Sequence, residues 1–452
     1  MKRFISLLFA LVFTLVAVLC SGCNTAEETT EALPEITMVG LLGEDGEALY
    51  RIIRPDDATD SEIQNASKLK RALKELTGAD FSITTDLLKP SEDVTVISEI
   101  LIGATNRTES IAASEGLTVN DYVVRVDGNK IVIAGGGEVM LSRAVEEFLS
   151  VVGKENTFMI DKNTDIRRSV ERGPYLVALT NQGKSKLEVY DISDGKLDES
   201  SLVWSCKMPY YNIAGAKFRH SETYGDVALA VCGDNYGCMV SYPEGKVLWS
   251  TEATASNPHS IELMPNGVIA IASSSGGEVR FFTTDEKTSL TPSAKVALKD
   301  AHGVLWDDEK QVLWAIGRNM LVAYRVTFDG GNVSVTEEES LRATIPSDWS
   351  HDLAPVYGNK DELLITTGSH VYRFNKTAKT FSTIPNLDGT YIKGVGSFDD
   401  GSIVYIYPDG EFRSWTSQSA YILRADNSMK CTTLESDNGH FYKIRVWDTR
   451  YQ

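Results

Sequence analysis

The sequence predicts a small α/β domain followed by an all-β, six-bladed β-propeller whose N-terminal and C-terminal strands pair to close the ring. The first observation is a difference between the two parts of the chain, because all seven Trp and all six His lie beyond residue 200. The second is that helical periodicity ends before residue 165, whereas short apolar strands recur beyond residue 172. The third is the period of that recurrence, which is the size of one propeller blade.

Composition excludes one class of partner. The chain has 452 residues, with 63 acidic and 44 basic side chains and a formal net charge of −19. A surface with this excess repels phosphate backbones, so we do not expect a nucleic-acid-binding protein. Any anion that the protein binds must meet a local exception to this charge. We expect the protein to be a monomer.

The start of the chain has the pattern of an export signal. A short basic segment precedes an almost unbroken apolar run over residues 4–19, and small residues then lead to Cys23. This pattern resembles a bacterial lipoprotein signal, which implies cleavage of residues 1–22, lipidation of Cys23 and a polar tether over residues 23–34. Cleavage before Cys20 and an uncleaved anchor helix are the alternatives. In each case we expect an exported, membrane-anchored protein that faces the extracytoplasmic side.

Residues 35–165 are predicted to fold as the α/β domain. Cap-type residues begin at Thr59, apolar residues then recur at helical spacing, and Gly78 ends that helix. The glycines at 135–137 lie between a strand and a second helix, where no Lys-Ser/Thr follows as in a phosphate loop, so we expect a turn with left-handed backbone. Predicted strands cover residues 48–54, 81–85, 99–103, 122–126 and 130–134, and the second helix carries Leu141, Ala144, Val145, Phe148, Leu149 and Val152 on one face.

Three stretches of this domain carry a family signal. They are YRIIRPDDATDSEIQNASKLKRALKELTGADFSI, ILIGATNR and DYVVRVDGNKIVIAGGGEVMLSRAVEEFLSVV. Together they resemble the non-catalytic N-terminal domain of family 67 α-glucuronidases and family 20 hexosaminidases. That domain carries no catalytic residues in those enzymes, so the resemblance assigns none here. It implies a glycan-related setting for the protein.

Residues 172–452 are built from a repeated segment. Each copy has a Lys or His, a loop and then an apolar strand, and these anchor residues recur every 42 to 50 residues. The period is typical of propeller blades, and six copies predict six blades, with seven as the alternative. No strand follows the last anchor, and the segment YLVALT near residue 175 supplies one if the two ends of the domain pair. The anchors are Lys217, His259, His302, His351, Lys393 and Lys443.

The six anchors are expected to form a ring, because the first strand of each blade lines the central channel of a propeller. No acidic residue alternates with them, so the Lys residues are predicted to bind a carboxylate or sulfate, such as that of a uronic acid in an anionic carbohydrate. The His residues are predicted to act as catalytic acids or bases and to hold a divalent metal, zinc or manganese. The predicted substrate-binding residues are Lys217, Lys393 and Lys443, and the predicted catalytic and metal-binding residues are His259, His302 and His351.

A purely structural role is the alternative for the anchors, which can also tie blades together by bonding to neighbouring backbone. Glu262 and Asp352 are near the anchors in sequence and are expected to orient the histidines. The remaining histidines, His220, His370 and His440, fall outside the repeat and are expected to be structural. An exported protein permits disulfides, and four cysteines allow three pairings that the sequence leaves open, namely those among Cys206, Cys232, Cys238 and Cys431.

The predicted propeller carries two further resemblances. The stretches NPHSIELMPNGVIAIASSSGGEVRFF, AHGVLWDDEKQVLWAIG, SHDLAPV and GHFYKIRVW resemble an uncharacterised family of bacterial propeller proteins, a domain of unknown function. A weaker similarity is to the oligogalacturonate lyases, seven-bladed propellers in which a histidine-bound metal serves uronate elimination. The motifs of those enzymes are not reproduced here, so this similarity concerns the chemistry of the site only.

Three functions are consistent with these observations. The first is a surface-anchored enzyme that acts on anionic glycan fragments, with metal-assisted β-elimination as the expected reaction. The second is a lipoprotein that binds such glycans without turnover. The third is a scaffold whose propeller face binds another protein.

Overall fold

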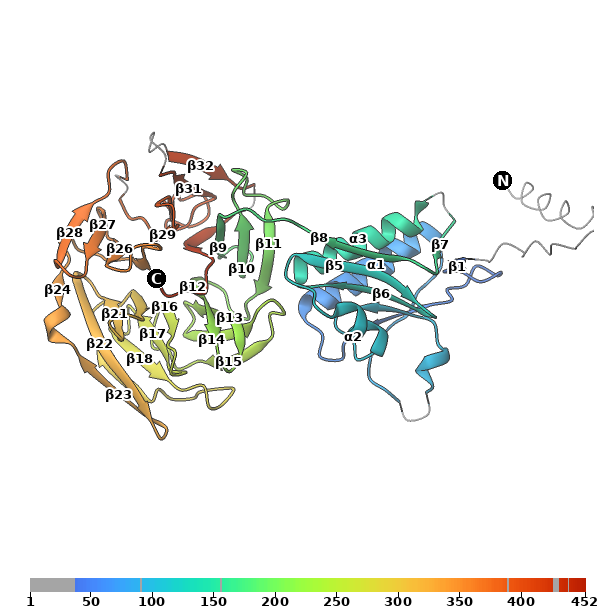
Figure 1. Cartoon of the computed structure of the whole chain (residues 1–452), viewed down its shortest axis with the longest axis horizontal. Coiled ribbons are helices and arrows are strands. Elements are labelled where there is room, and N and C mark those ends of the chain that lie inside the picture. Colours follow the sequence, from blue (N-terminus) through green and yellow to red (C-terminus); the bar gives the residue numbers. More distant parts are fainter. Residues whose placement is uncertain (1–36, 90–91, 155–156, 388–389, 426–430, 438) are drawn as a thin grey trace, which may run out of the picture. The chain divides into compact units, whose positions relative to one another are not determined.

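The computed structural model describes residues 37–452 apart from 90–91, 155–156, 388–389, 426–430 and 438. The predicted signal peptide, the predicted lipidation site Cys23 and the tether lie outside the described residues. None of the described helices is long and apolar enough to span a membrane. Most of the described secondary structure is β-strand, and six sheets are arranged around a common centre (Figure 1).

The N-terminal region, which we define as residues 38–169, contains a mixed six-stranded sheet of order β3-β2-β4-β6-β5-β8. The pairs β2–β3, β2–β4 and β4–β6 are parallel, whereas β5 pairs antiparallel with β6 and β8. Apolar residues of α1 and α3 pack with the sheet into one core. The elements are β1 (Met38–Gly40), β2 (Arg51–Arg54), α1 (Asp60–Thr77), β3 (Ile83–Thr85), a 3₁₀-helix (Val94–Val96), β4 (Glu99–Ile102), α2 (Thr108–Ser114), β5 (Asp121–Asp127), β6 (Lys130–Gly135), α3 (Glu138–Val152), β7 (Met159–Asp161) and β8 (Asp165–Ser169).

The ends of α1 are set by local side-chain chemistry. The Thr59 hydroxyl accepts a hydrogen bond from the Glu62 amide at 3.3 Å, and the Glu62 carboxylate accepts one from the Thr59 amide at 2.8 Å, which is a reciprocal capping box. At the other end Gly78 adopts a left-handed conformation with φ 81° and donates to the Lys74 carbonyl. The helix therefore begins and ends where the sequence predicts.

The glycine run before α3 differs from the prediction. None of Gly135, Gly136 and Gly137 lies in the left-handed region, and Gly137 is extended at φ 173°. Glycine is needed there because the backbone packs closely. A Cβ on Gly136 would lie 1.8 Å from the Thr118 carbonyl oxygen, and one on Gly135 would lie 2.2 Å from the Leu141 nitrogen. The predicted left-handed turn is wrong.

The propeller has six sheets, named here blades 1 to 6 in chain order, and this confirms the predicted blade number. In blade 1, β33 pairs antiparallel with β9 and lies at the inner edge of the sheet. Blade 1 contains β9 (Leu176–Asn181), β10 (Lys186–Asp191), β11 (Leu202–Lys207) and β33 (Phe441–Val446). Blade 2 contains β12 (Ile213–Ser221), β13 (Gly225–Cys232), β14 (Tyr236–Ser241) and β15 (Val247–Thr251). Blade 3 contains β16 (Pro258–Leu263), β17 (Ile269–Ser273), β18 (Glu278–Phe282) and β19 (Ala294–Ala297).

Blades 4 to 6 follow the same order, with their first strand innermost. Blade 4 contains β20 (Gly303–Asp307), β21 (Val312–Ile316), β22 (Met320–Asp329) and β23 (Asn332–Glu337), followed by a 3₁₀-helix (Glu339–Leu341) and β24 (Ala343–Thr344), which pairs with β22. Blades 5 and 6 contain β25 (Asp352–Pro355), β26 (Glu362–Thr366), β27 (Val371–Asn375) and β28 (Thr380–Thr383); and β29 (Gly394–Ser397), β30 (Ile403–Ile406), β31 (Ser419–Leu423) and β32 (Cys431–Glu435). The inner strands β33, β12, β16, β20, β25 and β29 contact one another in this order around the channel.

Hydrophobic clusters between neighbouring blades hold the ring together. Trp249 of blade 2 meets Phe282 of blade 3 with ring centroids 5.7 Å apart, and Trp314 of blade 4 meets Phe374 of blade 5 at 6.0 Å. Burial of one large aromatic side chain stabilises the fold by roughly 4–6 kcal/mol at about 25 cal/mol per Å². These contacts fix the inner strands, and so they fix the positions of the channel side chains.

The four described cysteines are free. Cys206, Cys232 and Cys238 are buried and Cys431 is exposed. None of the three possible pairings is formed among them. Packing and ion pairs therefore stabilise the described part of the propeller without disulfides.

Candidate functional site

Five side chains meet in a continuous row where the inner strands begin, at one mouth of the channel. We call them the mouth cluster: Tyr442, His259, His302, His351 and Lys393. The Tyr442 hydroxyl lies 3.2 Å from His259 Nδ1, and the rings of His259 and His302 are stacked with centroids 4.4 Å apart. His351 meets His302 edge-on at 5.5 Å, and its Nε2 lies 3.0 Å from Lys393 Nζ. Three histidines and one lysine of the predicted ring are thus brought together.

Hydrogen bonds define how these rings are protonated. His302 Nδ1 donates to the Asp300 carbonyl at 2.9 Å, and a carboxylate oxygen of Asp300 lies 3.4 Å away, so Nε2 is left as the acceptor. His351 Nε2 accepts from the Lys393 ammonium group, so its proton is on Nδ1. That Nδ1 is buried and has no partner among the described residues. His302 Nε2 is therefore an unused acceptor of the cluster, whereas the unused donor of His351 is buried.

Burial makes the histidines neutral and leaves Lys393 as the charged member. Desolvation, followed by the nearby Lys and His groups, lowers the pKa of His259 far below its usual range and that of His351 to about 2. Desolvation is also the largest cause of the lowered pKa of His302. Lys393 has its pKa lowered to about 8 by burial alone. At neutral pH the cluster is therefore three imidazoles beside one ammonium group.

Lys217 is deeper in the channel and is paired with a buried carboxylate, contrary to the prediction. Its Nζ lies 2.8 Å from Glu262 Oε2 and also donates to the Val304 carbonyl. Arg219, two residues later on β12, contacts both oxygens of the same carboxylate at 2.7 and 2.9 Å. The Trp306 amide also donates to Glu262 at 3.3 Å. We call this set the first clasp; it joins β12, β16 and β20.

Lys443 belongs to a second clasp of the same design. Its Nζ lies 3.1 Å from Asp352 Oδ1, and Arg445, again two residues later on its strand, contacts both Asp352 oxygens. The Val395 amide donates to Asp352 at 2.9 Å, and Lys443 Nζ donates to the His351 carbonyl. The second clasp joins β25, β29 and β33, so the two clasps together connect all six inner strands.

The clasps overturn two expectations. Lys217 and Lys443 do not form an uncompensated basic arc, because Glu262 and Asp352 are fully buried beside them. The two carboxylates do not orient the histidines either, because their oxygens are taken by Lys, Arg and backbone amides. Buried charges need such partners, since a lone buried charge is costly. The role of tying blades together through a buried carboxylate therefore applies to Lys217 and Lys443, whereas Lys393 meets only the neutral His351 of the neighbouring blade.

Residues 447–452 cross the opposite end of the channel. The Arg450 carbonyl accepts hydrogen bonds from Arg219 at 3.1 Å and Tyr357 at 3.2 Å, and the Tyr451 hydroxyl donates to the Leu263 carbonyl at 2.8 Å. Trp447 stacks on Phe218 with centroids 4.2 Å apart. With this segment at one end and the clasps inside, a ligand reaches the mouth cluster from the mouth.

The mouth does not fit the predicted zinc or manganese site. Within the part of the chain that the structure describes, no set of three or more His, Cys, Asp or Glu is arranged to hold a metal ion. The rings of His259 and His302 are stacked face to face, so their nitrogens do not converge. His351 turns its Nε2 lone pair to the Lys393 ammonium group. We therefore derive no step through a metal.

A cavity of about 250 Å³ adjoins the mouth cluster at His259 and Tyr442. The loop between β30 and β31 forms part of its wall through Trp415, whose indole nitrogen donates to Gln182 Oε1 at 3.0 Å. Arg413 of the same loop donates to the amide oxygens of Gln182 and Asn212. The volume has room for a ligand smaller than a typical drug. The lining residues are Gln182, Asn212, Ala214, Gly233, Asn257, His259, Trp415 and Tyr442.

Backbone strain is concentrated around the same mouth. The loops that enter five of the inner strands each hold a non-glycine residue at positive φ. Such conformations cost about 1–3 kcal/mol each and are found preferentially at functional sites, most notably for bulky residues. The five residues are Asn212 (58°), Asn257 (59°), Asp300 (56°), Trp349 (64°) and Tyr391 (60°). Trp349 and Tyr391 are also exposed, as are Trp415, Phe412 and Tyr211, which form an aromatic rim.

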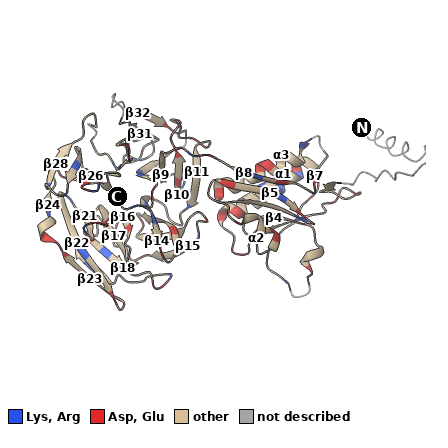
Figure 2. Cartoon of the chain, viewed as in Figure 1, with Lys and Arg blue, Asp and Glu red and all other residues tan. Residues whose placement is uncertain are grey.

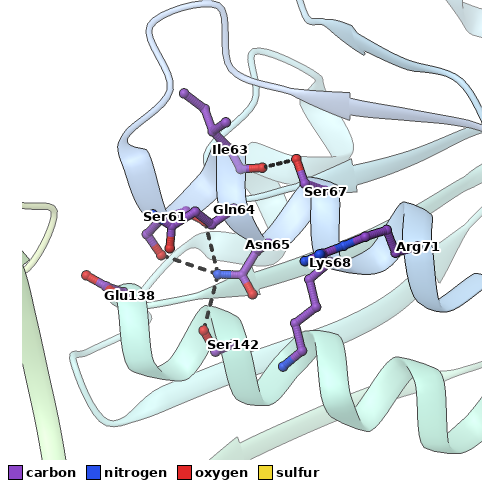
Figure 3. A pocket seen from close by; sticks show the side chains of 9 residues that line it. All are labelled: Ser61, Ile63, Gln64, Asn65, Ser67, Lys68, Arg71, Glu138 and Ser142. Atoms are coloured by element: carbon purple, nitrogen blue, oxygen red, sulfur yellow. Dashed lines mark hydrogen bonds between the residues drawn. The ribbon is translucent and has the colours of Figure 1, made fainter.

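A second cavity, of about 470 Å³, lies in the N-terminal region between α1 and α3 (Figure 3). Two of its polar side chains are already bonded: Asn65 Nδ2 donates to Ser61 and Ser142, and Lys68 is paired with Glu146 at 2.7 Å. It contains no histidine and no strained residue. We therefore assign the candidate site to the smaller cavity at the propeller mouth.

The histidines outside the repeat have structural contacts. His220 Nδ1 lies 2.7 Å from an Asp226 oxygen, His370 packs on Tyr372, and His440 stacks on Phe412. Three further residues of the mouth, Tyr442, Arg413 and Trp415, are not among the predicted site residues. Tyr442 could have been predicted, because it is next to the anchor Lys443 in the sequence. Arg413 and Trp415 could not, because they are on a loop outside the repeat.

The fold and the mouth define a six-bladed β-propeller with a buried, histidine-rich mouth. Residues 229–420 match the model of a family described as "Family of unknown function (DUF6528)", which confirms the predicted resemblance of the propeller to a domain of unknown function. None of the curated proteins matches this chain. A solved structure, of a functionally unknown protein from Desulfotomaculum acetoxidans DSM 771, is similar at 10% identity with a TM-score of 0.39; the similarity covers 61% of this chain and 100% of that one.

Proposed function

We propose that the propeller mouth binds an acidic saccharide and that Lys393 contacts its carboxylate. The observation that carries this proposal is the state of Lys393. Of the three ring lysines, it alone has no carboxylate partner among the described residues, while Lys217 and Lys443 are paired with carboxylates in the clasps. A half-buried ammonium group in a chain of net charge −19 is the local exception that an anionic ligand requires.

The neighbours of Lys393 support a saccharide as the anion. The neutral His302 offers an acceptor to hydroxyl groups, and the amides of Asn212 and Asn257 line the adjoining cavity with further hydrogen-bonding groups. Trp415 supplies a flat apolar wall for the face of a sugar ring. Basic and acidic residues are spread over both parts of the chain (Figure 2).

The proposal includes the setting of the protein. We propose that the chain is exported and anchored through lipidated Cys23, that residues 38–169 act as a small α/β domain of the kind that accompanies glycan-processing enzymes, and that the pairing of β33 with β9 closes the propeller. The signal-like first 22 residues and the antiparallel β33–β9 register support these statements. Such a protein meets saccharides outside the cytoplasm.

The test is calorimetric titration with galacturonate and with uncharged galactose. The wild-type protein is expected to bind the acidic sugar in preference to the neutral one. Lys393→Gln should weaken binding of the acid about tenfold or more, which is the usual value of a charge-assisted hydrogen bond. Lys360→Gln is the matched control. Lys360 is exposed in the β25–β26 loop, at the end of blade 5 that is far from the mouth. Equal binding by wild type and Lys393→Gln would contradict the proposal.

A second candidate function is turnover of the bound acid by β-elimination without a metal. It is favoured by His302, whose Nδ1 is fixed by Asp300 while Nε2 stays free to take a proton. In that reaction His302 Nε2 removes the proton from the carbon next to the carboxylate, and the electron pair of that bond forms a double bond to the β-carbon. The bond from the β-carbon to the leaving oxygen breaks, and this oxygen takes up a proton from water. A new ultraviolet absorbance from the unsaturated product, lost in His302→Gln with binding retained, is the expected result. Absence of that absorbance in the wild type would leave binding alone.

A further inference from the structure

We propose that Arg413 is a second anion contact and that the ligand therefore carries at least two acidic groups. This inference rests on the proposed function, because it concerns the same mouth. It narrows the ligand from an acidic sugar to an oligosaccharide with neighbouring acidic units.

Arg413 is held in place without being neutralised. Its Nη1 donates to Gln182 Oε1 at 3.2 Å and to Asn212 Oδ1, and both acceptors are uncharged amides. The guanidinium group also lies over the rings of Phe412 and Trp415, 5.1 and 5.7 Å from their centroids. Among the described residues its Nε and Nη2 have no hydrogen-bond partner. The group is therefore oriented and still has donors to offer.

Other arginines of the propeller are in a different state. Arg219 and Arg445 are paired with buried carboxylates, and Arg450 contacts both Asp448 and Asp399. Arg413, by contrast, is held by amides and aromatic rings and has no carboxylate partner among the described residues. Guanidinium groups bind carboxylates in a two-pronged geometry that the free Nε and Nη2 of Arg413 can supply.

The positions of the two cations determine what they can bind. Lys393 directly precedes β29 of blade 6, whereas Arg413 reaches Gln182 of blade 1 and Asn212 of blade 2. The cavity lined by Trp415, Asn257 and His259 is beside Arg413. Both residues belong to blade 6, but their charged groups extend to different neighbours: Lys393 Nζ meets His351 at the start of blade 5, and the Arg413 guanidinium meets residues of blades 1 and 2. Two acidic groups on linked sugar units therefore fit this arrangement better than one.

The test compares galacturonate with di- and trigalacturonate by calorimetry at low salt. The wild type should bind the oligomers about tenfold or more tightly than the monomer. Arg413→Gln should lose that difference while keeping the affinity for the monomer, and Arg413→Lys should keep part of it. Arg424→Gln is the matched control: Arg424 is in the same blade and is stacked on an aromatic ring, Tyr175, but it follows the far end of β31.

The outcomes separate this inference from the proposed function. If Arg413→Gln binds the oligomers as tightly as the wild type, the second contact is wrong while binding through Lys393 stands. If wild-type protein binds neither monomer nor oligomers, the proposed function fails, and the inference fails with it. Unchanged monomer affinity in Arg413→Gln also shows that the variant is folded at the mouth.

Discussion

Replacing Asp352 by Asn tests whether the clasps hold the inner strands together. Asp352 is fully buried and accepts hydrogen bonds from Lys443, Arg445 and the Val395 amide. The variant leaves two cations facing a neutral amide. Breaking a buried ion pair in this way costs about 3–5 kcal/mol. Part of this cost is relieved if Lys443 releases its proton, because one of the two cations is then removed. Burial lowers the pKa of Lys443 to about 8, so releasing this proton costs about 1.4 kcal/mol for each pH unit below that pKa.

The assay is urea unfolding followed by tryptophan fluorescence at pH 7. We expect Asp352→Asn to lower the free energy of unfolding by about 3 kcal/mol or more. The control is Asp348→Asn, because Asp348 is half exposed in its pair with Arg318, and such pairs contribute about 0–1 kcal/mol. A loss in Asp352→Asn no larger than in the control would refute the reasoning. The sign with pH also follows: the Asp352 pKa is lowered in the fold, so its stabilisation is present above about pH 4 and is lost as pH falls through the folded pKa.

Three further predictions concern the mouth. Affinity for galacturonate should be constant from pH 6 to 7, because the histidine pKa values are lowered out of that range. It should fall above about pH 8, because Lys393 then loses its proton. A calorimetric pH series in which the affinity changes near pH 6.5 would contradict neutral histidines. Trp415→Ala should weaken saccharide binding by about 1–2 kcal/mol, since it removes the apolar wall of the cavity, while Trp349→Ala, on the rim, should cost less. Addition of a chelator should leave galacturonate affinity unchanged; a loss restored by zinc or manganese would mean that the histidines rearrange to hold a metal.

The blade number could be predicted from the sequence because it is a periodic property. Anchor residues 42 to 50 residues apart mark the inner strands whatever their side chains contact. The limits of α1 were predictable for a similar reason, since Thr59, Glu62 and Gly78 act on their own neighbours. Both kinds of signal are carried by residues close in the chain or regular along it.

The depth of each anchor in the channel could not be predicted. Bulges shift the register of β12, β16 and β33, so the same distance from a strand start does not give the same level. Lys217 and Lys443 consequently meet carboxylates that are 45 and 91 residues away, while Lys393 meets His351. The pairs Lys217–Arg219 and Lys443–Arg445 are the sequence feature that indicates the clasps. Residues two apart on a strand face the same side, so each pair places two cations where one carboxylate can meet both.

The central claim is that Lys393 binds a carboxylate of an acidic saccharide at the propeller mouth. A crystal structure of the protein with trigalacturonate tests it most directly. The predicted result is a sugar carboxylate within hydrogen-bond distance of Lys393 Nζ, with the adjoining sugar against Trp415 and a second carboxylate at Arg413. A trisaccharide found only elsewhere, for example in the cavity between α1 and α3, would contradict the claim.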